Sequence, residues 1–341
     1  MSVVARGSEQ DRLDQRTSSI SNDFEQLAPS WTERLRCPSC GASVTLCTDL
    51  VLCRNEACSY SDHGFPRIDG QPVLIDFVDS VFPRSNYQRG NGSALPRALS
   101  RRGLRSRLHL LVDGSNPIAA RNCELFLSIL KEQKRNPSIL VIGGGAIGLG
   151  ADKLYSDPDI SLVGTDVYAS PHTNLLADAH KLPFANGTFD GVWIQAVLEH
   201  VLDPAAVVDQ LHRVLKPGGI VYAETPFMQQ VHERAYDFTR FTQSGHRWLF
   251  RRFEEISAGP ITGPATVLLW SIRYLLRALG AGEKVSQAVP LMLSWIRFLD
   301  RFCNRRETAD GAGGVFFLGC RSDSAIPAVS MPEYYERQTR R

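Results

Sequence analysis

Residues 139–148 read Ile-Leu-Val-Ile-Gly-Gly-Gly-Ala-Ile-Gly, and residues 160–166 read Ile-Ser-Leu-Val-Gly-Thr-Asp. Each apolar run has the length and branched composition of a buried strand, and the glycines between them let the backbone pass close to a ligand. A strand, a glycine turn, a crossover and a second strand ending in an acid are typical of the nucleotide-binding half of a doubly wound α/β fold. The acid, Asp166, can accept hydrogen bonds from both hydroxyls of a ribose. Taken alone, the glycines are also compatible with an ordinary strand-to-helix turn.

Three further motifs follow this unit. Residues 178–184 read Asp-Ala-His-Lys-Leu-Pro-Phe, residues 189–194 read Phe-Asp-Gly-Val-Trp-Ile, and residues 213–219 read Arg-Val-Leu-Lys-Pro-Gly-Gly. With this set the chain resembles the class I S-adenosylmethionine-dependent methyltransferases of the type 11 kind, strongly over residues 120–250 and more weakly as far as residue 321. The resemblance implies an α/β fold with a Rossmann-like sheet of seven strands, the last one antiparallel. It also implies S-adenosyl-L-methionine as the cofactor and methyl transfer as the activity.

The resemblance implies a set of cofactor-binding residues as well. They are the glycines of the turn, the acids after the second and third strands with their neighbours, and an amide after the fourth strand: Gly143, Gly145, Asp166, Val167, Asp178, Ala179 and Gln195. The turn departs from the family pattern in two places. Most relatives carry an acid where this chain has Val141, and the third glycine falls at Gly148 rather than one place earlier. A degenerate copy that binds partners without catalysis is therefore one alternative.

Four cysteines near the amino terminus have the spacing of a zinc site. They form a C-x2-C-x12-C-x4-C set made of Cys37, Cys40, Cys53 and Cys58. Four thiolates complete a tetrahedron and leave no open position, so the predicted zinc ion is structural. This spacing favours metal binding in a reducing cytoplasm over disulfides, and free or redox-active thiols are the alternative. Residues 65–77 resemble the end of the small zinc ribbons that are fused to methyltransferases or partner them.

Length and composition predict how the chain is divided. The chain has 341 residues, 43% of them apolar, and a net charge of +2. We expect a disordered tail over 1–30, a zinc ribbon over 31–79, a linker over 80–115, a methyltransferase domain over 116–322 with a helical insertion at about 263–305, and a loose tail over 323–341. The amino terminus lacks the apolar stretch of a signal peptide, and no apolar window of about 18 residues is free of charge. We therefore expect a cytoplasmic protein without a membrane-spanning helix.

The segment after the fifth expected strand carries candidate catalytic residues. It contains His232 and, at residues 236–242, the run Tyr-Asp-Phe-Thr-Arg-Phe-Thr. It looks like a subgroup of bacterial methyltransferases linked to polysaccharide, glycolipid and natural-product pathways, in which such a block lies on the substrate side. Methyl transfer to a hydroxyl requires a base, and histidine has a suitable pKa. His232 is therefore the predicted proton acceptor, with Asp237 and Arg240 in the same pocket. The alternatives are a structural Asp237–Arg240 ion pair and catalysis by His200.

Three functions remain in competition at this point. The first is O-methylation of a sugar-containing, lipid-linked or natural-product metabolite, so that the partner is a small-molecule or glycolipid acceptor. The second is RNA methylation, using the ribbon and the arginines of residues 97–107; the low net charge argues against it, and these arginines also fit a solvated linker. The third is a non-catalytic binding protein. Apolar helical stretches at 267–279 and 289–302 are expected to form a lid or a homodimer contact, with a peripheral membrane contact as the further alternative.

Overall fold

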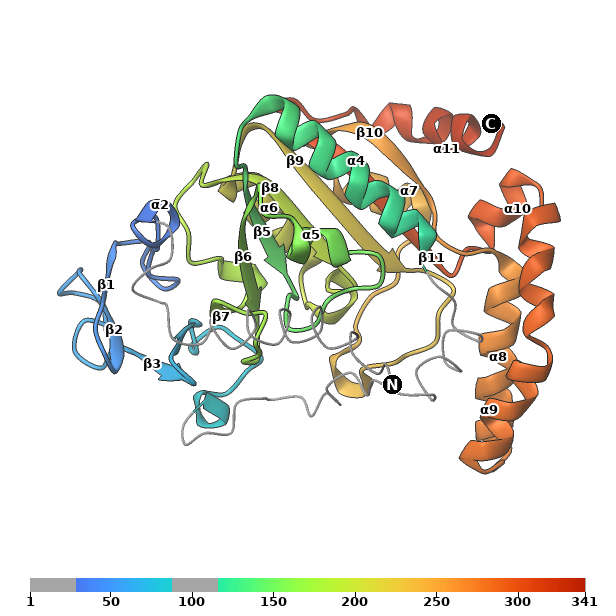
Figure 1. Cartoon of the computed structure of the whole chain (residues 1–341), viewed down its shortest axis with the longest axis horizontal. Coiled ribbons are helices and arrows are strands. Elements are labelled where there is room, and N and C mark those ends of the chain that lie inside the picture. Colours follow the sequence, from blue (N-terminus) through green and yellow to red (C-terminus); the bar gives the residue numbers. More distant parts are fainter. Residues whose placement is uncertain (1–28, 88–115, 341) are drawn as a thin grey trace, which may run out of the picture.

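The computed structural model describes residues 29–87 and 116–340 (Figure 1). Within these residues the strands form one sheet in the order β1-β2-β3-β4-β7-β6-β5-β8-β9-β11-β10. In chain order the strands are β1 (Val44–Leu46), β2 (Leu50–Cys53), β3 (Phe65–Ile68), β4 (Gln71–Leu74), β5 (Ser138–Ile142), β6 (Ser161–Asp166), β7 (Leu175–Ala177), β8 (Phe189–Gln195), β9 (Leu215–Pro226), β10 (Phe253–Pro260) and β11 (Gly314–Arg321). The stretch 139–148 thus supplies the central strand and the turn that follows it.

Helices surround this sheet. They are α2 (Pro29–Thr32), α4 (Pro117–Gln133), α5 (Asp152–Ser156), α6 (Pro204–Val214), α7 (Gln243–Leu249), α8 (Pro264–Ala278), α9 (Glu283–Met292), α10 (Arg305–Asp310) and α11 (Met331–Arg340), with short 3-10 turns between them. The helix α4 begins where the sequence predicts, because the Asn116 side chain accepts a hydrogen bond of 2.9 Å from the amide of Ala119 and proline occupies the first helical position. None of the described helices is both long and apolar enough to cross a membrane.

The part of the sheet from β7 to β10 is the predicted seven-stranded methyltransferase sheet. Strands β5 to β9 run parallel, and β11 is antiparallel to both of its neighbours, β9 and β10. Both faces are covered, which explains why the strands read as nearly continuous apolar runs. Side chains of β5 alternate between the two cores: Ile139 and Val141 pack with α4, whereas Leu140 and Ile142 pack with α6. The predicted fold class is confirmed.

The cysteine-rich segment, predicted as a zinc ribbon over 31–79, is joined to this sheet. Strand β4 pairs in parallel with β7, with Val73 opposite Leu176, so that β1 to β4 extend the sheet beyond the predicted seven strands. Trp31 packs edge-on against Phe184 of the larger part, with ring centroids 6.4 Å apart. Sequence patterns of period two indicate a strand but do not indicate its distant partner, so this pairing could not be predicted.

The carboxyl-terminal segment differs from the loose tail expected over 323–341. Its last ten described residues form α11, which packs beside α7. The Tyr334 ring is buried, and the Arg247 guanidinium lies 6.0 Å from its centroid. Gln338 donates a hydrogen bond of 3.0 Å to Glu255. A single buried aromatic on a mostly polar helix is a weak sequence signal, and this explains why the sequence did not indicate a helix here.

The remaining predicted segments fall as follows. Helices α8 to α10 lie between β10 and β11, the place of the predicted insertion at about 263–305, and Figure 1 shows α8 and α9 standing together away from the central strands. The predicted tail over 1–30 lies outside the described residues except for its last two. The linker over 80–115 is described only as far as Tyr87, which is buried and donates a hydrogen bond of 2.8 Å to the carbonyl of Val167.

Candidate functional site

A cavity of about 810 Å³ lies at the carboxyl ends of the parallel strands. The last residues of four strands line it: Ile142 of β5, Asp166 of β6, Gln195 of β8 and Glu224 near the end of β9. Ligands bind at this edge in doubly wound sheets because the loops there diverge from the switch in strand order. The geometry of the sheet therefore places the predicted nucleotide-binding residues around one space.

The carboxylate of Asp166 is fixed against the glycine turn. One oxygen accepts a hydrogen bond of 2.8 Å from the Gly145 amide, and the other accepts one of 2.7 Å from the Val167 amide. A Cβ on Gly145 would lie 2.2 Å from the Tyr168 ring, so only glycine lets the turn approach this closely. Gly143 has a φ of +74°, a conformation that other residues rarely adopt. The turn therefore has little freedom, and Asp166 keeps one orientation.

Asp178, Ala179 and Val167 line the same cavity. The carboxylate of Asp178 accepts hydrogen bonds of 2.6 Å from Ser80 Oγ and 2.6 Å from His180 Nδ1. Burial acts to raise the pKa of Asp178, but the hydrogen bonds from His180 and Ser80 outweigh it, and the pKa is lowered. Both oxygens thus already have donors within the protein. The role of Asp178 as a cofactor-binding residue remains a prediction.

Glu224 was missed by sequence reasoning and stands in the wall near the glycine turn. Its carboxylate accepts hydrogen bonds from Asn116 Nδ2 at 2.7 Å, Tyr222 Oη at 2.8 Å and Gln195 Nε2 at 3.3 Å. Burial raises its pKa to about 7. The family's acid is absent at Val141, but an acid on β9 reaches the same cavity. The signal was an acid at the end of an apolar run, the same signal that singled out Asp166.

The predicted catalytic residues come together on the other side of the cavity. His232 lines the cavity wall, whereas Asp237 and Arg240 lie behind it. Asp237 and Arg240 form a two-pronged ion pair, and the His232 amide donates a hydrogen bond of 2.9 Å to Asp237. Burial opposes ionisation of Asp237, but hydrogen bonds from Arg240 and His232 lower its pKa to about 2. The ion pair considered as the structural alternative is therefore formed, and it holds the loop that carries His232.

His200 and Glu199 complete this side of the site. Nε2 of His200 lies 3.1 Å from Nε2 of His232, and Oε1 of Glu199 lies 3.6 Å from the first and 3.7 Å from the second. The Glu199 side chain is fully buried, which raises its pKa to about 8, and burial lowers the pKa of both histidines. The sequence indicated His200 as an alternative base but gave no role to Glu199. A charged residue between the apolar Leu198 and Val201 was the signal for it.

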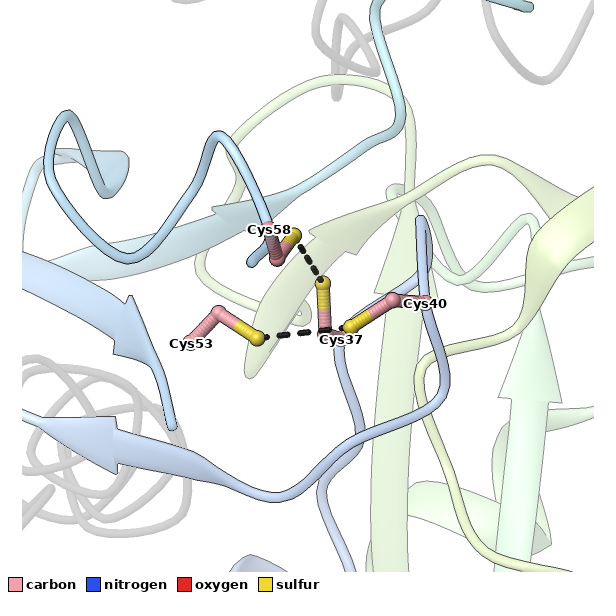
Figure 2. Close-up of side chains that lie close together, drawn as sticks. All are labelled: Cys37, Cys40, Cys53 and Cys58. Carbon is pink, nitrogen blue, oxygen red and sulfur yellow. Dashed lines mark hydrogen bonds between the residues drawn. The ribbon is translucent and has the colours of Figure 1, made fainter. Parts of the chain in front are cut away.

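The four predicted zinc ligands converge in the amino-terminal part. Figure 2 shows the side chains of Cys37, Cys40, Cys53 and Cys58 pointing toward one another. The Sγ atoms of Cys37 and Cys58 are 3.9 Å apart, those of Cys40 and Cys53 are 3.4 Å apart, and all four lie within 4.8 Å of one another. Zinc–sulfur bonds of about 2.3 Å in a tetrahedron require sulfur atoms about 3.8 Å apart. The donor set and its spacing therefore fit a zinc ion, and Cys47 lies outside the set.

Comparison with known proteins locates the family within the chain. Residues 155–223 match the family described as "Methyltransferase domain". Together with the strand order of the sheet, this match supports a class I S-adenosylmethionine-dependent methyltransferase domain. Two curated relatives are Ubiquinone/menaquinone biosynthesis C-methyltransferases UbiE: that of Saccharophagus degradans is 35% identical over 102 residues, and that of Geobacter sulfurreducens is 32% identical over 109 residues. The matched regions are 29% and 30% of this chain but only 37% and 39% of those relatives.

A likeness to solved structures is weak. Phosphoethanolamine N-methyltransferase 2 of Haemonchus contortus, in complex with S-adenosyl-L-methionine, is 19% identical, with a TM-score of 0.40 over 66% of this chain and 58% of that one. A TM-score this low supports no inference about the present chain. The methyltransferase fold rests on the strand order and directions described above.

The residues of the methyltransferase cavity fit S-adenosyl-L-methionine by their donor chemistry. Asp166 offers a fixed carboxylate at the end of β6 for the ribose hydroxyls. Glu224 offers a second carboxylate, matched to the ammonium of the methionine part. Gln195 holds Glu224 and also donates to the Leu149 carbonyl at 3.1 Å, which ties the glycine turn to β8. Despite the departure at Val141, the cavity is thus lined by two carboxylates, Asp166 at the position that the resemblance implies and Glu224 on β9.

Proposed function

We propose that this protein transfers a methyl group from S-adenosyl-L-methionine to a hydroxyl of a small metabolite that is sugar-containing, lipid-linked or a natural product. The observation that carries this proposal is a single cavity with two chemically different ends. One end presents Asp166 and Glu224 to a cationic nucleoside, and the other presents His200 and His232 to an acceptor. S-adenosyl-L-methionine supplies an electrophilic methyl group on a sulfonium. The chain has to align that methyl group with the acceptor oxygen and remove a proton.

The histidines are placed to remove the proton of the acceptor hydroxyl. In this proposal an acceptor hydroxyl near His232 gives its proton to an imidazole nitrogen as its oxygen takes the methyl group, and the electrons of the broken carbon–sulfur bond stay on sulfur. Asp237 orients His232 through the backbone amide and lies 3.5 Å from its Nδ1. Arg240 in turn fixes Asp237. Asp237 and Arg240 thus act as positioning residues, because neither lines the cavity.

The helical insertion supports an acceptor with an apolar portion. Trp270 and Arg273 of α8 line the cavity, so the insertion forms part of its wall. Farther along, large apolar side chains are exposed, among them Leu279, Met292 and Phe302. A lid, a contact with a second copy and a membrane surface all fit this face. A lipid-linked acceptor would use the lid and the membrane surface together.

Methylation of carbon is the second candidate. It is favoured by the names of the relatives, which are C-methyltransferases of ubiquinone and menaquinone biosynthesis. An acceptor of that class carries a phenolic hydroxyl, and removing its proton makes the neighbouring ring carbon nucleophilic. The two histidines would serve this reaction in the same way. The two candidates therefore differ in the acceptor that the cavity admits rather than in the groups that remove the proton.

A two-stage experiment tests the proposal. Calorimetry first measures binding of S-adenosyl-L-methionine to the full chain; binding is expected, and its absence would favour the non-catalytic alternative. Cofactor with a ¹³C-labelled methyl group is then incubated with metabolite, lipid and RNA fractions, and the products are followed by NMR. The chemical shift separates a methyl ether from a methyl on carbon. Label that enters only RNA would contradict the proposal in favour of the RNA alternative.

A further inference from the structure

Three donor atoms converge at the acceptor side of the cavity without a shared partner. They are Nε2 of His200, Nε2 of His232 and Oε1 of Glu199, separated by 3.1, 3.6 and 3.7 Å. They come from two loops: the 3-10 turn after β8 (Leu198–His200) and the segment after β9. The histidines are 32 residues apart in sequence. A contact between them is therefore built by the tertiary fold.

The opposite nitrogen of each histidine faces an acceptor. Nδ1 of His200 lies 2.7 Å from the carbonyl oxygen of Tyr236, so Nδ1 must carry the proton and Nε2 must present a lone pair. Nδ1 of His232 faces the carboxylate of Asp237 at 3.5 Å. Histidines that bind metals show this arrangement, because a carbonyl or carboxylate behind the ring fixes the tautomer. The 3.1 Å between the two Nε2 atoms also fits a hydrogen bond donated by His232 to the lone pair of His200, and a metal ion between the two nitrogens would take the place of that proton.

Glu199 provides an independent observation at the same place. Its side chain is fully buried, and neither carboxylate oxygen has a hydrogen-bond partner among the described residues. Buried polar groups in folded proteins are nearly always satisfied, and a buried carboxylate without donors is among the costliest exceptions. Oε1 lies 3.6 Å from Nε2 of His200 and 3.7 Å from Nε2 of His232. A cation at the centre of these three atoms would contact the carboxylate and both imidazole nitrogens at once.

The geometry of the three atoms matches a metal ion. For a triangle with sides of 3.1, 3.6 and 3.7 Å, the point equidistant from all corners lies about 2.0 Å from each. Zinc in proteins binds histidine nitrogen at about 2.0–2.1 Å and carboxylate oxygen at about 2.0–2.2 Å. We propose that Glu199, His200 and His232 bind one divalent transition-metal cation of the zinc class. Two imidazoles and a carboxylate form a site that leaves further positions open.

The open positions give this ion a role that rests on the proposed function. His200 and His232 line the cavity, so the ion would face the space for the acceptor. A hydroxyl oxygen bound to such a cation has a lowered pKa. Its proton would pass to solvent water, and the oxygen would then take the methyl group. The metal would thus replace the free imidazole of His232 as the means of removing the proton. Binding of the ion itself requires no methyl transfer.

Counting zinc atoms in the full chain tests the site. Protein purified without chelator and equilibrated with a small excess of Zn²⁺ is desalted and analysed by elemental mass spectrometry. The wild type is expected to hold one zinc ion more than the Glu199→Gln and His232→Asn variants, while the cysteine cluster contributes equally to all three. His180→Asn is the matched control, because His180 lines the same cavity but is bonded to Asp178. It should keep the wild-type count.

Equal zinc counts in the wild type and in both variants would overturn the proposal. A second measurement uses the folded wild type alone, loaded with Co²⁺. The cysteine cluster gives intense sulfur-to-cobalt absorption, and the proposed site is expected to add weak visible bands that have no sulfur-to-cobalt component. A spectrum with sulfur ligation only would also overturn it. Binding of S-adenosyl-L-methionine is measured on the same samples. If the wild type held the extra zinc ion but did not bind S-adenosyl-L-methionine, the proposed function would be contradicted while the metal site would still be supported.

Discussion

The cysteine cluster and the Glu199–His200–His232 cluster are both sets of metal ligands, but the fold assembles them differently. The four thiols come from two turns within residues 37–58, form a closed set, and are not among the residues that line the cavity described above. The other three ligands come from two distant loops, Tyr236 and Asp237 lie behind the two histidines, and the histidines line the cavity. A closed set stabilises a fold, whereas an open set leaves room for chemistry. The first should therefore respond to mutation in stability and the second in activity.

The largest effect is expected from a cysteine substitution. Cys53→Ser removes one of four ligands and should abolish tight zinc binding. It should lower the free energy of unfolding of the amino-terminal part on the order of 5–10 kcal/mol, since so small a core depends on its metal. Thermal unfolding monitored by circular dichroism, together with zinc analysis, measures both effects. Cys47→Ser is the control and should stay within about 1 kcal/mol of the wild type. An unchanged melting temperature in Cys53→Ser would show that the cluster is not structural.

The complementary change is His232→Ala. Turnover with the identified acceptor should fall about 10²–10⁴-fold, the range expected for loss of a group that assists proton removal. The melting temperature and the affinity for S-adenosyl-L-methionine should stay close to those of the wild type. Steady-state kinetics and calorimetry separate the two outcomes. His63→Ala, an exposed histidine of the amino-terminal part, is the control. A large loss of stability in His232→Ala would show that this cluster, like the cysteine cluster, has a structural role.

A smaller effect is expected at the cofactor end of the cavity. Asp166→Ala removes a carboxylate that could accept two ribose hydroxyls and should weaken binding of S-adenosyl-L-methionine by about 10²-fold, because hydrogen bonds to a charged group contribute about 1.5–3 kcal/mol each. Titration calorimetry measures the change. Asp159→Ala, at an exposed position before the start of β6, should bind like the wild type. Equal affinities for both variants would remove Asp166 from the cofactor site.

The smallest predicted effect is a pH dependence from Glu224. Its pKa of about 7 lies above the ordinary 4.5 of a glutamate, so the folded state prefers the protonated form. Its contribution to stability is therefore complete below about pH 4.5 and is lost as the pH rises through 7. The ammonium of the cofactor requires the ionised form, so affinity should rise roughly tenfold between pH 6 and pH 8. Calorimetry on Glu224→Gln should show a weaker and flatter profile. The same slope in both proteins would assign the titration to another group.

Local sequence determined what could be predicted about the two clusters. The cysteine spacing, the strand–glycine–strand unit and the cap at Asn116 are short-range patterns, and each forms as predicted. Glu199 lies next to His200 in sequence, but only the fold brings His232 to the same point. Likewise Glu224 meets Gln195 because β8 and β9 run parallel in register. Contacts that depend on tertiary packing leave no periodic trace in a single sequence, and this is why these acids were missed.

The parallel pairing of β4 with β7 has a consequence for how this chain can be divided. Beyond β4, Ser80 donates to Asp178 and Asp76 pairs with Lys181 at 2.9 Å, so the amino-terminal part also supports the floor of the cavity. A chain shortened to residues 116–340 would leave β7 as an edge strand with unpaired backbone groups. Such an edge recruits other strands, and the shortened protein should aggregate. The amino-terminal part therefore covers the β7 edge of the methyltransferase sheet and prevents this edge from pairing with strands of neighbouring molecules.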